Sequence, residues 1–404
     1  MNLNIKCLFI LFLISIFLFI FINTSFANND NLDIYSPSCI LIDSDSGKIL
    51  YEKNAYKKMY PASTTKIMTA ILALENCNLN DKATASYNAV MTIPSGYSTA
   101  NIQIDEELTI EQLLELLLVH SANDAANVLA EYVGGSVDSF VSMMNTKANE
   151  LGLSGTHFTN PYGLHDDNHY TTAHDLAILM QYCFKNDTFK KICGQASCAI
   201  PQTNKSEPRK YSSTNEMLVA NNSNYYPYLT VGKTGFTTEA GECLVSVAYH
   251  NDLELIGVIL NSNNRFNDTR SLYDYGFNNF SIQNIVKEKD TITTVTVQNA
   301  TSKTKNLELL VSENIPVLAN KNTNLSDIKP QISLNSNISA PIEEGTVLGK
   351  VTYTVEGVGY TTNLIAANSV QKSKITLYIL YGSIICLILI IFLIFKISKK
   401  KIDE

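Results

Sequence analysis

An uncharged, predominantly apolar segment at residues 375–395 limits how this chain can fold more than any other feature of its sequence. A helix with a rise of about 1.5 Å per residue would be roughly 31 Å long here, which matches the hydrocarbon core of a bilayer. A helix on a soluble surface needs a polar face, and this segment has none. We therefore expect residues 375–395 to form a transmembrane anchor, so that only the preceding chain folds in water.

The lysines on either side of this segment indicate its orientation. Four lysines follow it between residues 396 and 401, whereas two precede it at 372 and 374. Positively charged residues accumulate on the cytoplasmic side of a membrane helix. We therefore expect residues 396–404 to be a cytoplasmic tail and the body of the chain to lie on the extracytoplasmic side.

The N-terminus also predicts export. Lys6 is followed by an apolar run from Cys7 to Ile22, and the small-residue stretch TSFA then ends at Ala27. This order is typical of a secretory signal peptide. We expect residues 1–27 to be that peptide.

Length and charge narrow the remaining possibilities. A chain of 404 residues favours two domains, at least one of them with a sizeable core. The formal net charge is −8, and the chain has no long basic run before its last residues, so nucleic-acid binding has no electrostatic support.

Cysteines do not require a disulfide framework. An exported location permits disulfides, and Cys193 and Cys198 are near neighbours, but a chain of this size is stable without cross-links. Free, mostly buried thiols are the favoured interpretation. The exported cysteines are Cys39, Cys77, Cys183, Cys193, Cys198 and Cys243.

Hydrophobic patterning predicts how the chain is organised. Residues 39–54 alternate apolar and polar positions around SDSG, which is typical of a β-hairpin. Apolar residues recur at helical spacing from Ser63 onward. Thr109 and Gln112 have the spacing of a capping box ahead of a leucine-rich helix, and the next helix stops at the glycines 134–135.

Short strands dominate the second half of the chain. Residues 243–261 indicate two strands joined at 250–253. Residues 281–370 are rich in β-branched residues separated by Asn, Pro and Gly, which predicts a small all-β domain without catalytic residue types. We interpret residues 28–280 as the domain that carries the chemistry and 281–370 as a stalk.

The chemistry is expected at PASTTK, residues 61–66. Ser63 and Lys66 are spaced i, i+3, so on a helix they share one face and the lysine amine can reach the hydroxyl. A serine needs a base, and a lysine serves as one when desolvation or a nearby cation lowers its pKa. The N-terminus of a helix also favours developing negative charge. On its own, this spacing is frequent by chance.

Two further motifs strengthen that interpretation. Ser121 and Asn123 lie at the break between two helical patterns, where polar side chains can point into a cleft. Lys233, Thr234 and Gly235 lie in a predicted edge strand, where the lysine offers a cation and the glycine lets a substrate backbone approach. This arrangement suits an extended peptide with a free carboxylate.

The order S-x-x-K, S-x-N and K-T-G resembles the penicillin-recognising serine enzymes. Within that group the chain is similar to the low-molecular-weight penicillin-binding proteins that are serine-type D-alanyl-D-alanine carboxypeptidases. The resemblance extends over residues 28–370, including the stretches 151–177, 264–277 and APIEEGTVLGKV. It implies an α/β fold with a mixed sheet, covering helices and a helical lobe, and it places Ser63 at their junction.

The resemblance also implies a role for each site residue. Ser63 would attack the penultimate D-alanine of a peptidoglycan stem peptide, Lys66 would take its proton, and Ser121 would pass a proton to the leaving amine. Asn123 would hold the substrate amide. The terminal carboxylate would bind Lys233, Thr234 and Arg265, and the oxyanion hole would consist of the backbone N–H groups of Ser63 and Phe236. Some relatives have histidine at the position of Phe236.

Other activities share this acylation step. A β-lactamase of the same fold is disfavoured because we find no convincing Glu-x-x-Leu-Asn segment to position a deacylating water, so β-lactams are expected to be covalent inhibitors. Transpeptidation and endopeptidase activity stay open. A non-catalytic penicillin sensor is disfavoured because Ser63, Lys66, Ser121, Asn123 and Lys233 are all present.

We expect neither a metal nor a cofactor. Four histidines at 157, 165, 169 and 174 lie near three aspartates and invite a zinc interpretation. Their spacing does not match a helical H-E-x-x-H motif or a known closed site. The similar enzymes have this loop without metal.

Overall fold

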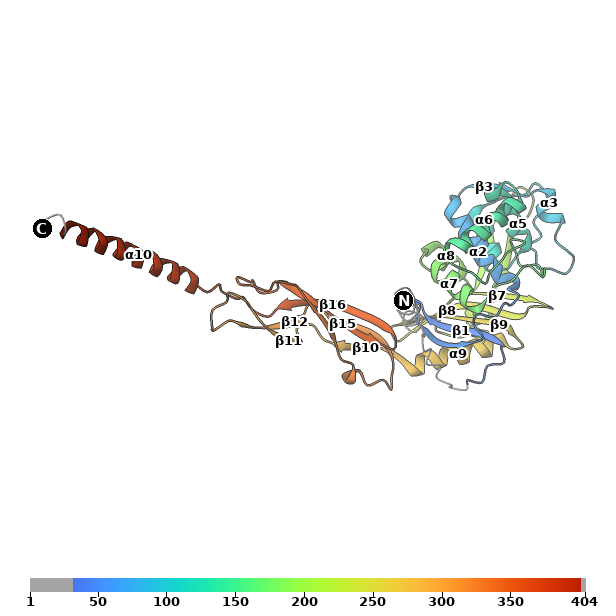
Figure 1. Ribbon diagram of the computed structural model, residues 1–404. Helices are drawn as coiled ribbons and strands as arrows, with labels where there is room; N and C mark the ends of the chain where they lie inside the picture. The colour runs from blue at the N-terminus through green and yellow to red at the C-terminus, as the bar shows by residue number, and fades with distance from the viewer. Residues whose placement is uncertain (1–31, 401–404) are drawn as a thin grey trace, which may run out of the picture. The chain divides into compact units, whose positions relative to one another are not determined.

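The computed structural model describes residues 32–400, so the predicted signal peptide lies outside the described part. The chain divides into two compact units. The first ends at Gly276 and the second begins at Phe277, with Asn251–Leu253 grouped with the second. Figure 1 shows the elements of both units along the chain.

A five-stranded sheet is the centre of the first unit (Figure 1). Its strand order is β2-β1-β9-β8-β7, and the pairings β1–β2, β1–β9 and β7–β8 are antiparallel. The two hairpins predicted from the sequence are present, and the strand with Lys233 is an edge strand as expected. The bounds are β1 Ser38–Asp43, β2 Ile49–Lys53, β7 Leu229–Thr237, β8 Gly241–His250 and β9 Leu253–Ser262.

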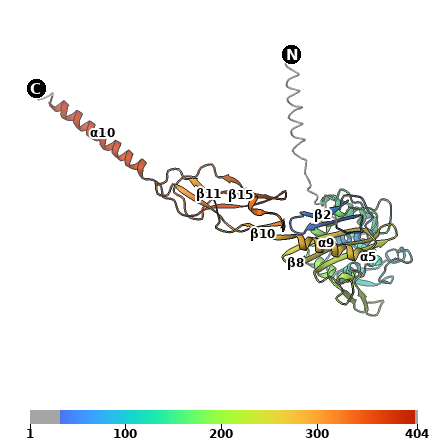
Figure 2. The same ribbon diagram turned by 90° about the horizontal axis from the view of Figure 1, so that it is seen from below.

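Helices cover both faces of this sheet, which confirms the expected α/β class. Helix α9, Arg265–Asn279, lies on one face, as Figure 2 shows from below. Gly257 of β9 lets this helix approach closely, because an added Cβ would be 3.1 Å from the Tyr273 ring. The remaining helices lie on the other side of the sheet (Figure 1). They are α2 Lys66–Asn76, α3 Tyr87–Met91, α4 Ile110–Leu118, α5 Asn123–Gly134, α6 Val137–Glu150, α7 Ala173–Cys183 and α8 Asp187–Cys193.

Two two-stranded antiparallel sheets and two 3₁₀ turns complete the first unit. The strand pairs are β3 Lys82–Thr84 with β4 Glu107–Thr109, and β5 Ser197–Ile200 with β6 Arg209–Ser212. The 3₁₀ turns are η1 Ala62–Thr65 and η2 Glu216–Leu218.

Local signals in the sequence fix the ends of the central helices. Thr109 Oγ1 accepts from the Gln112 backbone N–H at 3.2 Å, and Gln112 Oε1 accepts from the Thr109 N–H at 2.8 Å. This is the predicted capping box. Helix α5 stops where Gly135 adopts φ 75°, a left-handed conformation that glycine adopts without steric cost. Both helices therefore enter the core with defined ends.

The start of the first helix differs from the prediction. The periodicity suggested an α-helix from Ser63, whereas residues 62–65 form η1 and α2 begins at Lys66. Thr64 donates from its N–H to the Pro61 carbonyl at 3.2 Å, which is the i to i+3 bond of a 3₁₀ turn. Such a turn has three residues per turn, so it aligns Lys66 directly with Ser63.

The six cysteines from Cys39 to Cys243 are free thiols in the described part of the chain. Cys39, Cys183, Cys193, Cys198 and Cys243 are buried, and Cys77 is partly buried. Burial raises the pKa of Cys193 to about 11 and that of Cys243 to about 11. They act as small apolar groups of the core.

The second unit consists of two sheets around an apolar core. One sheet pairs β10 with β13, and the other has the order β11-β12-β16-β15-β14. Fully buried side chains of this core include Leu307, Leu309, Val317, Val351 and Leu364. Its strands are β10 Phe280–Val286, β11 Thr291–Thr296, β12 Asn306–Val311, β13 Ile315–Asn320, β14 Gln331–Leu334, β15 Val347–Val355 and β16 Val358–Ala366, with the 3₁₀ turn η3 Leu325–Asp327.

A long helix, α10 Ile375–Lys400, follows the second unit's sheets. Its stretch Leu377–Ile394 is long and apolar enough to cross a membrane. This length and composition are compatible with the anchor that the sequence predicts.

Candidate active site

Ser63 lies in η1, between two backbone segments that approach it without side chains. Gly163 has φ +89°, and an added Cβ there would be 1.8 Å from the Ala62 carbonyl oxygen. Gly235 of β7 lies on η1 as well, since its Cβ would be 2.9 Å from the Ser63 backbone nitrogen. Ala62 itself has φ 47°, a left-handed conformation that is rare for alanine. The turn is thus held by backbone packing in a strained shape.

Lys66 meets Ser63 as the spacing predicts. Its Nζ donates to Ser63 Oγ at 2.8 Å, to Asn123 Oδ1 at 2.6 Å and to the Tyr162 carbonyl at 2.9 Å. The lysine is 0% exposed, while Ser63 is only partly buried and open to a substrate. Three oxygen acceptors therefore fix the amine beside the hydroxyl.

The electrostatic surroundings of Lys66 favour its neutral form. Burial lowers its pKa well below the usual value, and the positive charge of Lys233 lowers that pKa further. Asp124, 1% exposed, opposes the shift. A neutral amine can accept a proton from the Ser63 hydroxyl at 2.8 Å, as a general base requires.

The second motif faces the first. Asn123 is the first residue of α5 and accepts from Lys66, as described above, while its own N–H donates to the Ser98 carbonyl at 2.9 Å. Ser121 stands just before this helix with φ 66°, again a left-handed conformation for a non-glycine residue. Both side chains are buried, at 6% exposure for Ser121 and 4% for Asn123.

The third motif lies on β7 and contacts the second motif. Lys233 Nζ donates to Ser121 Oγ at 2.9 Å and to the Thr234 carbonyl at 2.9 Å. The Thr234 hydroxyl lies 2.6 Å from that of Thr214, on the segment after β6. The structure therefore links all three motifs in the order Ser63, Lys66, Asn123 and Ser121, Lys233.

Lys233 is as buried as Lys66, at 0% exposure. Burial lowers its pKa to about 7, and the nearby Arg265 guanidinium contributes in the same direction, while Cys193 opposes it. A charge on either lysine disfavours a charge on the other. The two amines are therefore coupled, and both are easier to deprotonate than an exposed lysine.

Phe236 lies near the end of β7, and Arg265, the first residue of α9, contacts that strand. The Phe236 side chain is 62% exposed, so it points away from the packed interior. Arg265 Nη1 donates to the Gly235 carbonyl at 2.7 Å and to the Cys243 carbonyl at 3.3 Å, and its backbone N–H donates to Glu242 Oε2 at 3.0 Å. The guanidinium thus supports the strand that carries the third motif.

Comparison with known proteins places this arrangement in a family. Residues 24–264 match the family described as D-alanyl-D-alanine carboxypeptidase. The chain belongs to this family of serine peptidases. Residues 280–372 match the C-terminal domain of penicillin-binding protein 5. The resemblance seen in the sequence is confirmed, and the protein is a hydrolase of the serine D-Ala-D-Ala carboxypeptidase type.

Relatives cover nearly all of the folded chain. The D-alanyl-D-alanine carboxypeptidase DacF of Bacillus subtilis is 32% identical over 373 residues, covering 89% of this chain and 93% of DacF. The peptidoglycan synthesis regulatory factor PBP3 of Streptococcus pneumoniae has a TM-score of 0.67 at 28% identity, covering 84% of this chain and 100% of PBP3. Penicillin-binding protein 5 of Haemophilus influenzae has a TM-score of 0.64 at 27% identity, covering 84% and 98%.

The carboxypeptidase site includes residues that the motifs did not reveal. Asn160 Oδ1 accepts from the N–H groups of Gly163 at 2.7 Å and Leu164 at 2.9 Å, and so shapes the turn that presents the Tyr162 carbonyl to Lys66. Thr69 Oγ1 donates to the Pro161 carbonyl at 2.5 Å. The sequence NPYG is typical of a turn, but nothing in it predicts a contact with Lys66.

A buried histidine braces η1 in this carboxypeptidase. His169 Nδ1 accepts from the Thr159 N–H at 3.0 Å, so its Nε2 carries the proton and donates to Thr65 Oγ1 at 2.8 Å. Burial lowers its pKa to about 3, which keeps the ring neutral. Thr65 directly precedes Lys66, so His169 helps to position Lys66.

The other histidines of the same segment have separate partners. His157 Nδ1 lies 2.7 Å from the Asn168 carbonyl, His165 is 3.8 Å from Asp167, and His174 is 3.5 Å from Asp175. Within residues 32–400 no three His, Cys, Asp or Glu side chains are grouped to hold a metal. The zinc interpretation finds no support from the geometry.

Gly235 has a structural role that the sequence did not suggest. We expected it to leave room for the substrate backbone. That expectation stays a prediction, and the structure adds that the Pro61 carbonyl and the Ser63 nitrogen fill the space of the missing side chain, each 2.9 Å from an added Cβ. The glycine therefore brings β7 into contact with the turn that carries Ser63.

Proposed function

We propose that this enzyme removes the terminal D-alanine from peptidoglycan stem peptides that end in D-Ala-D-Ala, through an acyl-enzyme on Ser63. One observation carries the proposal. The fully buried Lys66 amine lies 2.8 Å from the Ser63 hydroxyl oxygen, and burial lowers its pKa. A serine with a neutral amine at hydrogen-bond distance is an activated nucleophile.

In acylation, Ser63 Oγ bonds to the carbonyl carbon of the penultimate D-alanine while Lys66 takes the hydroxyl proton. The bond from that carbon to the nitrogen of the terminal D-alanine then breaks. Ser121 donates its hydroxyl proton to the leaving amine. It then takes a proton from Lys233, whose Nζ is 2.9 Å from Ser121 Oγ. Water then adds to the ester carbonyl and its released proton returns to Lys233, while Lys66 gives its proton back to Ser63 Oγ as the ester bond breaks.

The terminal carboxylate binds beside the third motif. Lys233 and Thr234 provide a positive charge and a hydroxyl on β7, and Arg265 adds a second positive charge behind the Gly235 carbonyl. Asn123 holds the substrate amide. Because β7 is the edge strand of its sheet, an extended peptide can align beside it.

The oxyanion hole consists of the backbone N–H groups of Ser63 and Phe236. The contact of Gly235 with the Ser63 nitrogen supports this proposal, because it brings the two backbones together. Since Phe236 contributes only its backbone, its exposed ring is free to contact the rest of the substrate. β-Lactams acylate the same serine and act as covalent inhibitors.

We further infer that α10 anchors the enzyme once in a bacterial cell membrane, with the catalytic unit on the extracytoplasmic side. The apolar stretch Leu377–Ile394 and the lysines that follow it support this topology. The β-rich unit would act as a stalk. A chain truncated after Lys374 should be soluble and retain full activity, measured by fractionation and D-alanine release. A truncated protein that still sediments with membranes would contradict the single anchor.

The test of the catalytic proposal is the release of free D-alanine from a D-Ala-D-Ala peptide, with and without prior penicillin. Penicillin-sensitive release is expected. Ser63→Ala should abolish both release and covalent penicillin labelling, because no other nucleophile replaces the hydroxyl. Labelling that survives in Ser63→Ala would refute the assignment, and labelling without release in the unmodified chain would indicate a sensor.

A further inference from the structure

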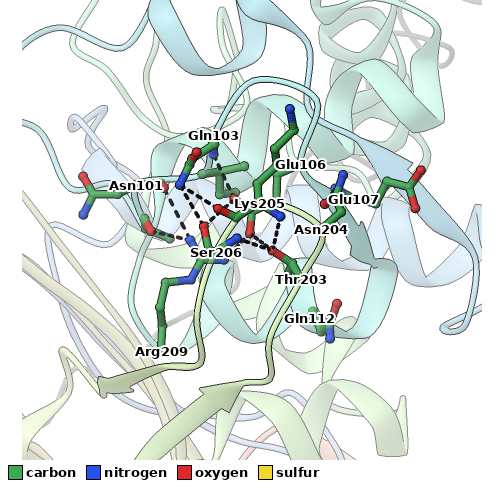
Figure 3. A network of polar contacts seen from close by, with 12 residues as sticks. Asn101, Gln103, Glu106, Glu107, Gln112, Thr203, Asn204, Lys205, Ser206 and Arg209 are labelled. Carbon is green, nitrogen blue, oxygen red and sulfur yellow. Dashed lines mark hydrogen bonds and ion pairs between the residues drawn. The ribbon is translucent and has the colours of Figure 1, made fainter.

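A polar network away from the reacting atoms connects β6 with the segment 98–106 (Figure 3). At its centre is Glu106, whose side chain is 0% exposed. Its Oε1 accepts from Arg209 Nη2 at 2.5 Å and from Thr203 Oγ1 at 2.8 Å, and its Oε2 accepts from the Gln103 N–H at 2.9 Å. A fully buried carboxylate requires such partners.

The stretch Ala100–Ile102 is bound from two sides. Its N–H groups donate to Asp124 at the start of α5, from Ala100 at 3.0 Å and from Ile102 at 3.0 Å. Its carbonyls face β6, where the Tyr211 hydroxyl donates to the Ala100 oxygen at 2.7 Å and Arg209 Nη1 to the same oxygen at 3.3 Å. Helix α5 and β6 are therefore tied together through one piece of backbone.

The same segment holds the residues around the second motif. The Ser98 carbonyl accepts from the Asn123 N–H at 2.9 Å. The Thr99 carbonyl lies 3.2 Å from His120 Nε2, and the His120 ring packs on Tyr211 with centroids 4.4 Å apart. His120 and Asn123 lie on either side of Ser121 in the chain. Their positions thus depend on where residues 98–102 lie.

Ser121 needs this support because of its backbone. A φ of 66° is unfavourable for serine and persists only where surrounding contacts hold it. With this backbone the hydroxyl reaches Lys233 Nζ at 2.9 Å. A small relaxation of the segment would let φ change and move the hydroxyl away.

We propose that the Glu106–Arg209 ion pair is a positioning device for Ser121, while the Asn123 side chain stays fixed through its contact with Lys66. The ion pair acts through the segment 98–102, which it holds against α5 and β6, and it touches no reacting atom. The inference rests on the proposed function, because the proton relay through Ser121 is assigned there. Weakening the pair slows acylation of Ser63 and leaves the affinity for substrate nearly unchanged.

The experiment compares Glu106→Gln and Arg209→Lys with the unmodified full chain in detergent. We expect Glu106→Gln to lower kcat and the rate of penicillin labelling by roughly 10- to 100-fold, because misplacement of about 1 Å costs that much. KM should change by less than about threefold, since the carboxylate site on β7 is untouched. Arg209→Lys keeps the charge and should be intermediate.

A matched control is Lys147→Met. Lys147 pairs with Glu75 at 2.9 Å, its side chain is 17% exposed like that of Arg209, and it lies on α6 away from the motifs. This variant should lose stability and keep its kcat. If Glu106→Gln behaves like Lys147→Met, with lowered thermal stability and unchanged kcat and labelling rate, the inference is overturned.

A second variant covers the case in which Glu106→Gln does not fold. Tyr211→Phe removes only the hydroxyl that binds the Ala100 carbonyl. Slower labelling in Tyr211→Phe and Arg209→Lys supports the positioning role, and normal rates in both overturn it. An unmodified chain that neither releases D-alanine nor binds penicillin would instead refute the proposed function itself.

Discussion

The two units of this molecule bury very different side chains. The first unit encloses Lys66, Glu106 and Lys233 at 0% exposure, together with Asp124 and Asp268 at 1%. In the described part of the second unit, the buried side chains are apolar apart from Thr362 at 5%. Both units contain β-sheets and a hydrophobic core, so neither feature accounts for the difference in buried ionisable side chains.

The contrast shows in which kind of domain ionisable side chains are kept buried. A buried charge carries a desolvation cost that its partners rarely exceed, so it seldom improves stability over an apolar residue. Strongly shifted pKa values are concentrated in catalytic sites for this reason. The first unit accepts this cost at Lys66 and Lys233 in its motifs and at carboxylates outside them, such as Glu106, whereas the second has the composition of a scaffold. The following changes would break or sharpen that distinction.

The largest effect is expected from Lys66→Met. The substitution removes the proposed base, so the rate of D-alanine release should fall by about 10²- to 10⁴-fold. Stability should stay equal or rise, because a buried amine is replaced by an apolar side chain of similar length. Assays of D-alanine release and thermal unfolding by circular dichroism measure both. A stable Lys66→Met enzyme with normal activity would remove Lys66 from the mechanism.

The reverse pattern is expected in the second unit. Leu309 is 0% exposed, and Leu309→Ala should destabilise that unit by about 2–5 kcal/mol through the cavity it leaves. The kcat for a soluble peptide should not change. Leu309→Met is the control, with an expected cost below about 1.5 kcal/mol. A fall in kcat with Leu309→Ala, below the unfolding temperature, would show that the second unit contributes to catalysis.

The smallest effect concerns pH and Lys233. In the folded protein the pKa of Lys233 is lowered to about 7, whereas the unfolded chain keeps that proton up to about 10.5. Between pH 7 and 9 the unfolded state therefore binds more protons, and stability should rise with pH by up to about 1.4 kcal/mol per unit. Above pH 9 the buried thiols oppose this trend, because the folded state keeps their protons.

Denaturant unfolding between pH 7 and 9 tests this dependence. The unmodified protein should gain stability across the range, and Lys233→Met should have a flatter profile. Equal slopes in the two proteins would mean that Lys233 is charged in the folded state at pH 9, contrary to the shift described above.

Much of the first unit could be predicted from local sequence. The hairpins, the capping box at Thr109 and the glycine stop after α5 depend on residues a few positions apart, and each is present as expected. The edge position of the strand with Lys233 also follows from its pattern. The three motifs lie together in the structure, as the resemblance to the family implies, although their spacing along the chain alone does not show it.

Other features could not be predicted because their causes are distant in the sequence. Arg209 and Glu106 are separated by 103 residues, and no periodicity connects them. The 3₁₀ turn at Ser63 depends on Gly163 and Gly235, which approach it from two other segments. The link from Arg265 to the Gly235 carbonyl likewise requires the fold to be known.

The contact between Gly163 and Ala62 has a consequence for inheritance. An added Cβ at Gly163 would be 1.8 Å from the Ala62 oxygen, so any codon change to another amino acid would displace the nucleophile. Selection by antibiotics cannot use this position to weaken acylation without also losing the enzyme. Phe236 differs, because its ring is 62% exposed. Heritable changes in drug sensitivity that preserve wall chemistry should therefore accumulate at the rim of β7 rather than beneath Ser63.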